Sequence, residues 1–248
     1  MKKYLFLFLI TFSIFSYSED YDFSNYTKFL SKEIKNGNFP GFVTLIYKDG
    51  KVIFSDTRGF ADIEDRLALN EDSLFRIYSM TKPITGAALM ILVEQGKVSL
   101  SDPVAKYIPE FKNTMVLNNK TNQLEKLDRE VTILDLATHS SGLTYSFVDR
   151  GKIKEIYDQE KIYPYYFLDN ISLERPAKKS YADICTLSEK VATLPLVHQP
   201  GEKWTYSIGM DILGCVIERA SNLSFGEFLK KNIFDPLGME DTFFKVPN

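Results

Sequence analysis

Apolar positions after residue 20 first follow a helical repeat and then change to a strand-like pattern. Residues 25–34 repeat apolar side chains with the spacing of an amphipathic helix. Residues 41–48 (GFVTLIYK) and 51–56 (KVIFSD) are rich in β-branched and aromatic residues, and the dipeptide Asp49-Gly50 between them is typical of a type I′ hairpin turn. The pattern predicts an antiparallel sheet that begins close to the N-terminus.

Helical spacing dominates the remainder of the chain. It predicts a long helix over residues 84–94 that stops at Gly96, followed by shorter helices over 103–107, 131–138, 211–220 and 225–233. Residues 113–130 are polar and rich in turn formers, which predicts a surface loop or ribbon. Residues 144–190 have no clear period but contain six tyrosines, and this stretch either lines a substrate cleft or forms a packed loop.

The first eighteen residues have the pattern of a secretory signal peptide. Lys2 and Lys3 precede an apolar run over residues 4–15, and small residues follow at Ser16 and Ser18. The run is about a dozen residues long, whereas a membrane-spanning helix needs roughly 20. We therefore expect residues 19–248 to form one exported domain, periplasmic or secreted, with no membrane span after cleavage; a retained anchor helix is the alternative.

Composition and charge exclude several classes of protein. The 248 residues contain 30 Lys and Arg against 33 Asp and Glu, a net charge of -3. Removal of Lys2 and Lys3 with the signal peptide would make the charge about -5, and no basic run offers a nucleic-acid groove. Nothing in the composition is typical of a fibrous or disordered protein. We expect no nucleic-acid partner.

The cysteines and histidines carry little chemistry by themselves. Cys185 and Cys215 are the only cysteines, and Cys215 lies on the apolar side of a helical pattern. Export would permit a disulfide, but two buried free thiols are the preferred interpretation. His139 and His198 stand apart, without the close ligand spacing of zinc sites, so no metal or cofactor is expected.

The segment Ser79-Met80-Thr81-Lys82 is a candidate catalytic centre. Pro83 lacks an amide proton and is tolerated only in a first helical turn, so the helix that follows should begin close to Ser79. Residues three apart on a helix are neighbours, which would place Lys82 beside the Ser79 hydroxyl. A helix N-terminus disfavours the ammonium form of a lysine, so a neutral Lys82 could act as general base for Ser79. The alternative is an ordinary helix cap followed by an exposed lysine.

Residues 75–111 (FRIYSMTKPITGAALMILVEQGKVSLSDPVAKYIPEF) resemble the nucleophile segment of the serine β-lactamase-related family. That family contains class C β-lactamases, D-alanyl-D-amino-acid carboxypeptidases and a branch of carboxylesterases. The resemblance continues through 131–143 (VTILDLATHSSGL) and 200–247. It implies an α+β fold of the β-lactamase/transpeptidase-like type. In that fold an antiparallel sheet is flanked by helices, a mostly helical lobe lies between its N-terminal and C-terminal strands, and the active site lies between lobe and sheet.

The resemblance also assigns roles to residues. Ser79 matches the acylated nucleophile, Lys82 its base partner and Tyr206 the tyrosine of the second family motif, which passes a proton to the leaving group and activates the deacylating water. The Ser79 N–H would supply one oxyanion donor. β-Lactamases and carboxypeptidases of the family carry Asn two residues after the tyrosine, but here the residue is Ile208. This departure favours the esterase branch.

A second departure concerns the third family motif, a Lys- or His-containing triad that ends in Gly. No such triad follows Tyr206, and Lys35-Asn36-Gly37 lies upstream of the nucleophile. The resemblance therefore implies a truncated or split member of the family, without the C-terminal strands of the sheet and the second oxyanion donor. Three functions follow as hypotheses: hydrolysis of small carboxylic esters, turnover of β-lactams or peptidoglycan-like D-aminoacyl peptides, or an inert fragment or cell-envelope binding module.

His139 offers a different hypothesis, a Ser-His-Asp centre with Ser79 or Ser141 as the nucleophile. The chain contains no Gly-x-Ser-x-Gly elbow to present such a serine. In the family the His139 segment is a loop without an acid-base role. We therefore expect His139 to be a structural residue.

Overall fold

A computed structural model describes residues 21–118, 120–149, 151–162 and 181–246. The predicted signal peptide lies outside these ranges. The chain forms two compact units, Met1–Phe75 and Arg76–Asn248, which we call the hairpin unit and the lobe. Each is described by itself below.

The hairpin unit is a small antiparallel sheet with one helix. Its elements are α1 (Ser24–Lys35), β1 (Gly41–Lys48), β2 (Lys51–Asp62) and β3 (Leu67–Ala68), with the strands in the order β1-β2-β3. The predicted turn is confirmed, because Asp49 and Gly50 both have positive φ, 49° and 77°. α1 packs on β2: the ring centroid of Phe54 lies 6.0 Å from that of Tyr26 on α1 and 4.4 Å from that of Phe23, directly before the helix. The sheet and the helix occur where the sequence predicts them.

The lobe is mostly helical, as the sequence predicts. Its elements are η1 (Tyr78–Met80), α2 (Thr81–Glu94), η2 (Val104–Lys106), η3 (Pro109–Asn113), β4 (Met115–Asn118), β5 (Gln123–Lys126), α3 (Ile133–Ala137), α4 (Lys152–Gln159), α6 (Ile184–Ala192), α7 (Gly209–Ser221), α8 (Phe225–Leu229) and the π-helical turn η4 (Lys230–Phe234). The predicted ribbon is the hairpin β4–β5, although Val116 and Leu117 on β4 are buried. After β5, the described residues form helices, turns and isolated bridges and no further strand.

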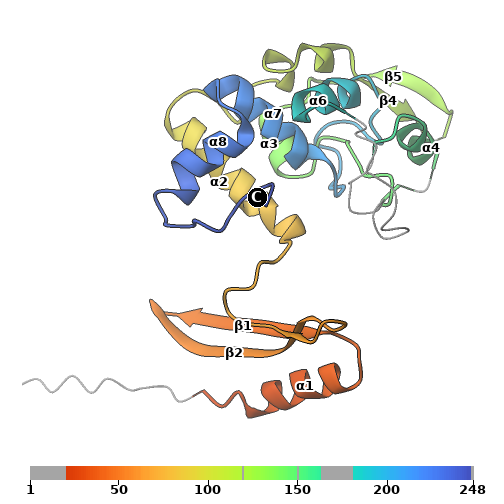
Figure 1. The fold of residues 1–248 in the computed structure, drawn as a ribbon. Coiled ribbons are helices and arrows are strands. Elements are labelled where there is room, and N and C mark those ends of the chain that lie inside the picture. Colours follow the sequence, from red (N-terminus) through yellow and green to blue (C-terminus); the bar gives the residue numbers. More distant parts are fainter. Residues whose placement is uncertain (1–20, 119, 150, 163–180, 247–248) are drawn as a thin grey trace, which may run out of the picture. The chain divides into compact units, whose positions relative to one another are not determined.

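Helix α7 is the centre of the lobe. α2, α3, α6 and α8 all pack against it, and the ribbon drawing shows it among them (Figure 1). Apolar residues at helical spacing on α7 are fully buried, among them Ile212, Leu213 and Val216, and Leu89 and Leu92 of α2 belong to the same core. In the described parts of the chain, no helix has the length and apolar character needed to cross a membrane.

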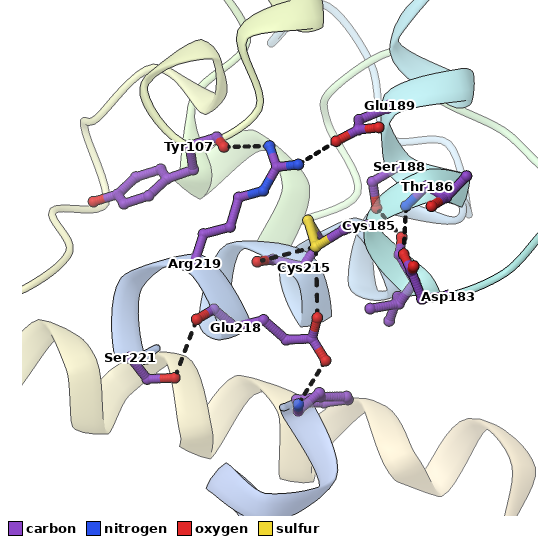
Figure 2. Close-up of a disulfide and its surroundings, with 12 residues drawn as sticks. Tyr107, Asp183, Cys185, Thr186, Ser188, Glu189, Cys215, Glu218, Arg219 and Ser221 are labelled. Carbon is purple, nitrogen blue, oxygen red and sulfur yellow. Dashed lines mark hydrogen bonds and ion pairs between the residues drawn. A yellow bond between two sulfur atoms is a disulfide. The ribbon is translucent and has the colours of Figure 1, made fainter. Parts of the chain in front are cut away.

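The prediction of two free thiols is wrong. Cys185 and Cys215 form a disulfide, with a Cα–Cα distance of 4.9 Å (Figure 2). Cys215 is buried on the apolar side of α7 as expected. The sequence pattern did not reveal that α6 packs on α7 with Cys185 facing Cys215. An ion pair between Arg219 and Glu189 joins the same two helices, so α6 and α7 are linked both covalently and electrostatically.

Candidate active site

Ser79 stands in a tight 3-10 turn directly before α2. Turn η1 and the start of α2 place its hydroxyl at a helix N-terminus, as Pro83 predicts. Lys82, in the first turn of α2, donates from Nζ to Ser79 Oγ at 3.1 Å. Tyr78 has a φ of +44°, a left-handed conformation that is unfavourable for a residue with a bulky side chain. Such backbone strain concentrates at functional sites, and here it lies one residue before the serine.

Tyr206 completes a three-residue cluster with Ser79 and Lys82. Its phenol oxygen lies 2.8 Å from Ser79 Oγ, although 127 residues separate the two along the chain. The segment that carries Tyr206 leads into α7, and α7 packs against α2. Lys82 Nζ lies 4.9 Å from the centroid of the Tyr206 ring. The structure therefore brings together the three residues that the sequence singles out.

The electrostatics of this cluster favour ionisation of Tyr206. Partial burial by itself would raise the pKa of Tyr206, but hydrogen bonding to Lys82 and Ser79 and the positive charge of Lys82 together lower it below its ordinary value. A phenol with a lowered pKa releases its proton more readily at a given pH. It is therefore better suited to exchange protons with a serine hydroxyl.

The loop after α3 holds the Tyr206 segment through its backbone. The Thr205 N–H donates to the His139 carbonyl at 2.8 Å, and the Ile208 N–H donates to the Thr144 carbonyl at 3.4 Å. These bonds flank Tyr206 on both sides. The position of the phenol is consequently set by the loop as well as by α7.

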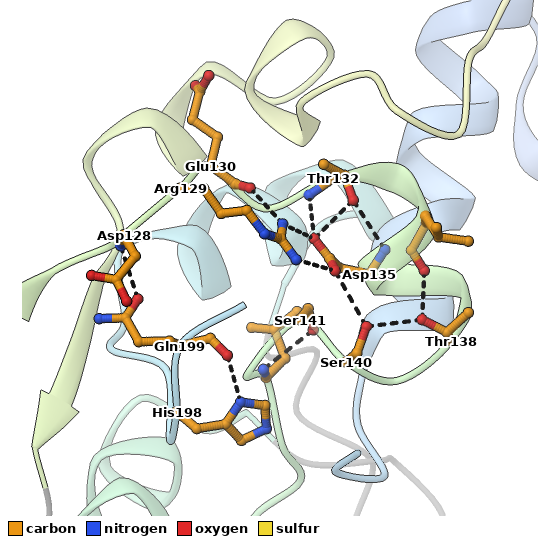
Figure 3. A network of polar contacts seen from close by, with 12 residues as sticks. Asp128, Arg129, Glu130, Thr132, Asp135, Thr138, Ser140, Ser141, His198 and Gln199 are labelled. Atoms are coloured by element: carbon orange, nitrogen blue, oxygen red, sulfur yellow. Dashed lines mark hydrogen bonds and ion pairs between the residues drawn. The ribbon is translucent and has the colours of Figure 1, made fainter. Parts of the chain in front are cut away.

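A polar network fixes that loop (Figure 3). Arg129 donates to both carboxylate oxygens of the buried Asp135, at 2.6 and 2.8 Å, and Ser140 donates to the same carboxylate at 3.2 Å. Gly142 has a φ of +86°, and a Cβ there would stand 2.2 Å from the His198 carbonyl oxygen. The close approach of two loop segments therefore requires glycine at this position.

Three side chains beside the cluster were not singled out as site residues from the sequence. The Tyr145 ring centroid lies 5.4 Å from that of Tyr206 and 5.9 Å from Lys82 Nζ. The Tyr145 hydroxyl donates to Asp211 Oδ2 at 3.2 Å, and burial raises the pKa of the Asp211 carboxyl. The His139 ring centroid lies 5.0 Å from that of Tyr206. These contacts join segments that are far apart in sequence, so local spacing could not reveal them.

The tyrosines of residues 144–190 that the structure describes differ in their surroundings. Tyr145 lies beside Tyr206, whereas Tyr157 is packed in the core of the lobe with no exposed surface. Tyr181 donates its hydroxyl to the Glu160 carbonyl at 2.6 Å. The remaining tyrosines of the stretch lie outside the described residues: Tyr163, Tyr165 and Tyr166.

Within residues 21–118, 120–149, 151–162 and 181–246, no group of three or more His, Cys, Asp or Glu side chains could hold a metal ion. His139 Nδ1 lies 3.2 Å from Ser207 Oγ, and His198 Nε2 lies 3.0 Å from Thr205 Oγ1. Both imidazoles are thus engaged in hydrogen bonds within the lobe.

The fold of the chain agrees with a comparison to known protein families. The model of the Beta-lactamase family matches residues 27–248. The chain therefore belongs to the Beta-lactamase family and has its β-lactamase/transpeptidase-like α+β fold.

Individual relatives are similar over most of this chain. Protein Rv1367c of Mycobacterium tuberculosis is 35% identical over 213 residues, which cover 85% of this chain and 49% of the relative. Esterase EstB of Burkholderia gladioli is 31% identical over 204 residues, covering 82% of this chain and 47% of the esterase. The chain spans about half the length of the curated relatives it matches.

Solved structures give the same result. EstCE1, described as a hydrolase with promiscuous acyltransferase activity, superimposes with a TM-score of 0.66 at 25% identity, over 86% of this chain and 50% of that one. The simvastatin synthase LovD from Aspergillus terreus gives a TM-score of 0.65 at 25% identity, over 86% and 50% of the two chains.

Proposed function

We propose that this protein is a serine hydrolase that acts on small carboxylic esters through an acyl-enzyme at Ser79. One observation carries the proposal: Ser79 Oγ lies within hydrogen-bonding distance of both Lys82 Nζ, at 3.1 Å, and the Tyr206 hydroxyl, at 2.8 Å. A serine hydroxyl is a weak nucleophile unless a neighbouring base removes its proton. This geometry supplies two candidate bases: Lys82 as the neutral amine, or Tyr206 as a phenolate beside the charged Lys82.

The reaction begins when Ser79 Oγ attacks the ester carbonyl carbon and its proton passes to the pair formed by Lys82 and Tyr206. The Ser79 N–H, at the helix N-terminus, donates to the carbonyl oxygen as negative charge develops there. The bond between the carbonyl carbon and the alcohol oxygen then breaks, and the alcohol leaves with a proton from Tyr206.

Deacylation reverses the proton path. A water molecule gives a proton to Tyr206 as its oxygen attacks the acyl carbon, the bond to Ser79 Oγ breaks, and the serine recovers its proton. The carboxylic acid leaves, and the three side chains return to their starting protonation states. Since Tyr206 accepts and donates in turn, its lowered pKa supports both half-reactions.

The environment of Ile208 supports esters over β-lactams and D-aminoacyl peptides. Ile208 caps the start of α7 and is 4% exposed, packed in the core of the lobe. An aliphatic side chain in that place offers no amide to bind the acylamino group of a β-lactam or a peptide. The relative Esterase EstB, whose name describes an esterase, supports the same choice of ester substrates.

The test is hydrolysis of 4-nitrophenyl acetate and of the β-lactam nitrocefin by the purified chain, beside Ser79→Ala. We expect ester turnover that the variant lacks, with nitrocefin turned over far more slowly. Faster nitrocefin turnover would replace the ester proposal by β-lactamase activity. Absence of both activities from a folded sample would favour the inert fragment or binding module.

We also infer export of this chain. The pattern of residues 1–18 and the disulfide between Cys185 and Cys215 both fit an oxidising compartment such as the periplasm or the cell exterior. The intact mass of the protein recovered from its native host tests this inference. Cleavage after Ser18 is expected, and a full-length cytoplasmic product would contradict it.

A further inference from the structure

The hydrogen bonds of His139 define which nitrogen of its imidazole carries the proton. The Ser207 N–H points at His139 Nδ1 at 3.3 Å, and Ser207 Oγ lies 3.2 Å from the same nitrogen. Ser207 Oγ in turn accepts the Gly209 N–H at 3.3 Å. Ser207 is fully buried, so its polar groups depend on these partners. The Ser207 N–H can only donate, so its bond to Nδ1 requires Nδ1 to be unprotonated and to accept.

His139 therefore holds both neighbours of Tyr206. Its carbonyl accepts the Thr205 N–H at 2.8 Å, and its Nδ1 accepts the Ser207 N–H. Its ring lies against the Tyr206 ring, with centroids 5.0 Å apart. One residue thus contacts the peptide before the phenol, the peptide after it and the phenol ring itself.

We propose that His139 is a positioning residue for Tyr206, which works only as the neutral imidazole protonated on Nε2. This inference rests on the proposed function of Tyr206 as the proton carrier. A proton on Nδ1 would face the Ser207 N–H and remove the acceptor that orients the Tyr206 segment. Acidification should therefore displace the phenol from Ser79 before the lobe unfolds.

The surroundings of the imidazole keep it neutral at neutral pH. Burial lowers the pKa of His139, and the positive charge of Lys82 on α2 lowers it further. Tyr206 is the titratable group that stacks on the ring, and Asp211 on α7 acts electrostatically on both Tyr206 and Lys82. Because the folded pKa is lowered, the working form of His139 dominates above that pKa and is lost as pH falls through it.

His198 provides an internal control, since the chain contains two histidines. Its Nδ1 lies 2.8 Å from the Gln199 carbonyl oxygen, which can only accept, so His198 must carry a proton on Nδ1. The two histidines are therefore expected to show opposite protonation patterns. Nitrogen-15 NMR of imidazole rings distinguishes a ring protonated on Nε2 from one protonated on Nδ1.

The experiment combines this NMR titration with kinetics on the full chain. We expect His139 to be protonated on Nε2 at pH 7.5, with a pKa below the ordinary value of an imidazole. The Ser207 amide resonance should shift as His139 titrates. In His139→Asn the amide oxygen replaces Nδ1 as acceptor without titrating, and asparagine tolerates the φ of +58° found here. His139→Leu removes the acceptor.

Acylation by a fluorophosphonate probe supplies the functional readout. Wild-type acylation should fall as pH drops through the His139 titration, and His139→Asn should lack that fall while retaining the rate at pH 7.5. His139→Leu should lose roughly a hundredfold, the cost of misplacing a reacting group by about 1 Å. Unchanged acylation in a folded His139→Leu, or a proton on Nδ1 at pH 7.5, would overturn the proposal.

Failure of the proposed function gives a different result. If the wild-type chain is never acylated, the hydrolase proposal fails. The NMR titration then tests the positioning role of His139 without the kinetics. Linked shifts of the Ser207 amide and the Tyr206 ring would then support the positioning role. If the Ser207 amide and Tyr206 ring resonances do not shift as His139 titrates, the positioning role is refuted.

Discussion

The hairpin unit and the lobe differ in how much apolar surface each encloses by itself. Leu30 is the only fully buried apolar side chain among the described residues of the hairpin unit. Leu45 and Tyr47 lie on β1, and no described element of that unit covers them. In the lobe, a continuous core of buried residues runs from Ala88 to Phe234.

The difference matters because the candidate site lies in the better packed region. Ser79, Lys82 and Tyr206 all belong to the lobe, and so do Tyr145 and His139 beside them. Side chains on packed helices keep their geometry, whereas the described part of the hairpin unit buries little apolar surface by itself. Catalytic geometry should therefore respond to changes in the lobe and tolerate changes in the hairpin.

The largest effect is expected at Lys82. Lys82→Ala removes a base that contacts Ser79 Oγ, and acylation by the fluorophosphonate probe should slow by about 10²–10⁴-fold. Lys82→Arg should lose a similar factor, because arginine keeps the charge but is not deprotonated in proteins. The exposed Lys51 at the start of β2 is the matched control, and Lys51→Ala should leave the rate unchanged. Retained activity in Lys82→Arg would assign proton transfer to Tyr206 alone.

One leucine substitution in each region compares how much packing in the lobe and in the hairpin unit contributes to the free energy of unfolding. Leu213→Ala opens a cavity at a fully buried position of α7 and should lower the free energy of unfolding by about 2–5 kcal/mol. Leu45→Ala on β1, where the leucine is 64% exposed, should change it by less than about 0.5 kcal/mol. Urea unfolding followed by circular dichroism measures both. Equal losses would show that the hairpin contributes as much packing as the lobe.

The disulfide should stabilise the lobe by a smaller amount. It closes a loop of 30 residues between α6 and α7, so the double variant Cys185→Ala, Cys215→Ala should lose about 2–4 kcal/mol. Thermal unfolding with and without dithiothreitol gives the same comparison for the wild-type chain. Two thiols that react with iodoacetamide in the folded, unreduced protein would mean that the disulfide is absent.

The smallest effect concerns two carboxyls of the lobe, Asp211 and Asp135, whose pKa values are shifted in opposite directions. Because burial raises the pKa of Asp211, the unfolded chain loses this proton first, and stability falls as pH rises through the folded pKa. Asp211→Asn removes that loss and should raise the Tm relative to wild type more at pH 7.5 than at pH 4.5. Each kcal/mol corresponds to roughly 2–4 °C.

Asp135 is the matched control for this prediction. Burial would raise its pKa, but hydrogen bonds from Arg129 and Thr132 lower it overall, so its stabilisation is present at neutral pH and lost as pH falls. Asp135→Asn should therefore lower the Tm at pH 7.5 and have less effect at pH 4.5. Calorimetry measures the Tm of both variants at the two pH values. Changes in Tm of the same sign in both variants at pH 7.5 would contradict the opposite pKa shifts of Asp211 and Asp135.

Sequence reasoning succeeded where the determining contacts are local. Asp49-Gly50 specified the hairpin turn, and Pro83 located the helix start beside Ser79. The spacing of three residues then placed Lys82 on the serine. Tyr206 required the family resemblance, because no local rule connects it to a serine 127 residues away.

The missed features depend on packing between distant segments. The disulfide needed the knowledge that α6 lies on α7, which the apolar pattern of either helix does not contain. The place of His139 and Asp211 beside the cluster follows from loops that meet only in the folded lobe. Gly142 was the available signal, since a glycine after His139 marked a turn with close approach.

Intact-protein mass spectrometry after exposure to a fluorophosphonate tests whether Ser79 is the nucleophile that becomes acylated. The serine oxygen replaces fluoride on phosphorus, so each labelled site adds a fixed mass. This account predicts one adduct on residues 19–248, located on Ser79 by peptide mapping, and none on Ser79→Ala. A folded protein without an adduct, or an adduct that persists in Ser79→Ala, would contradict it.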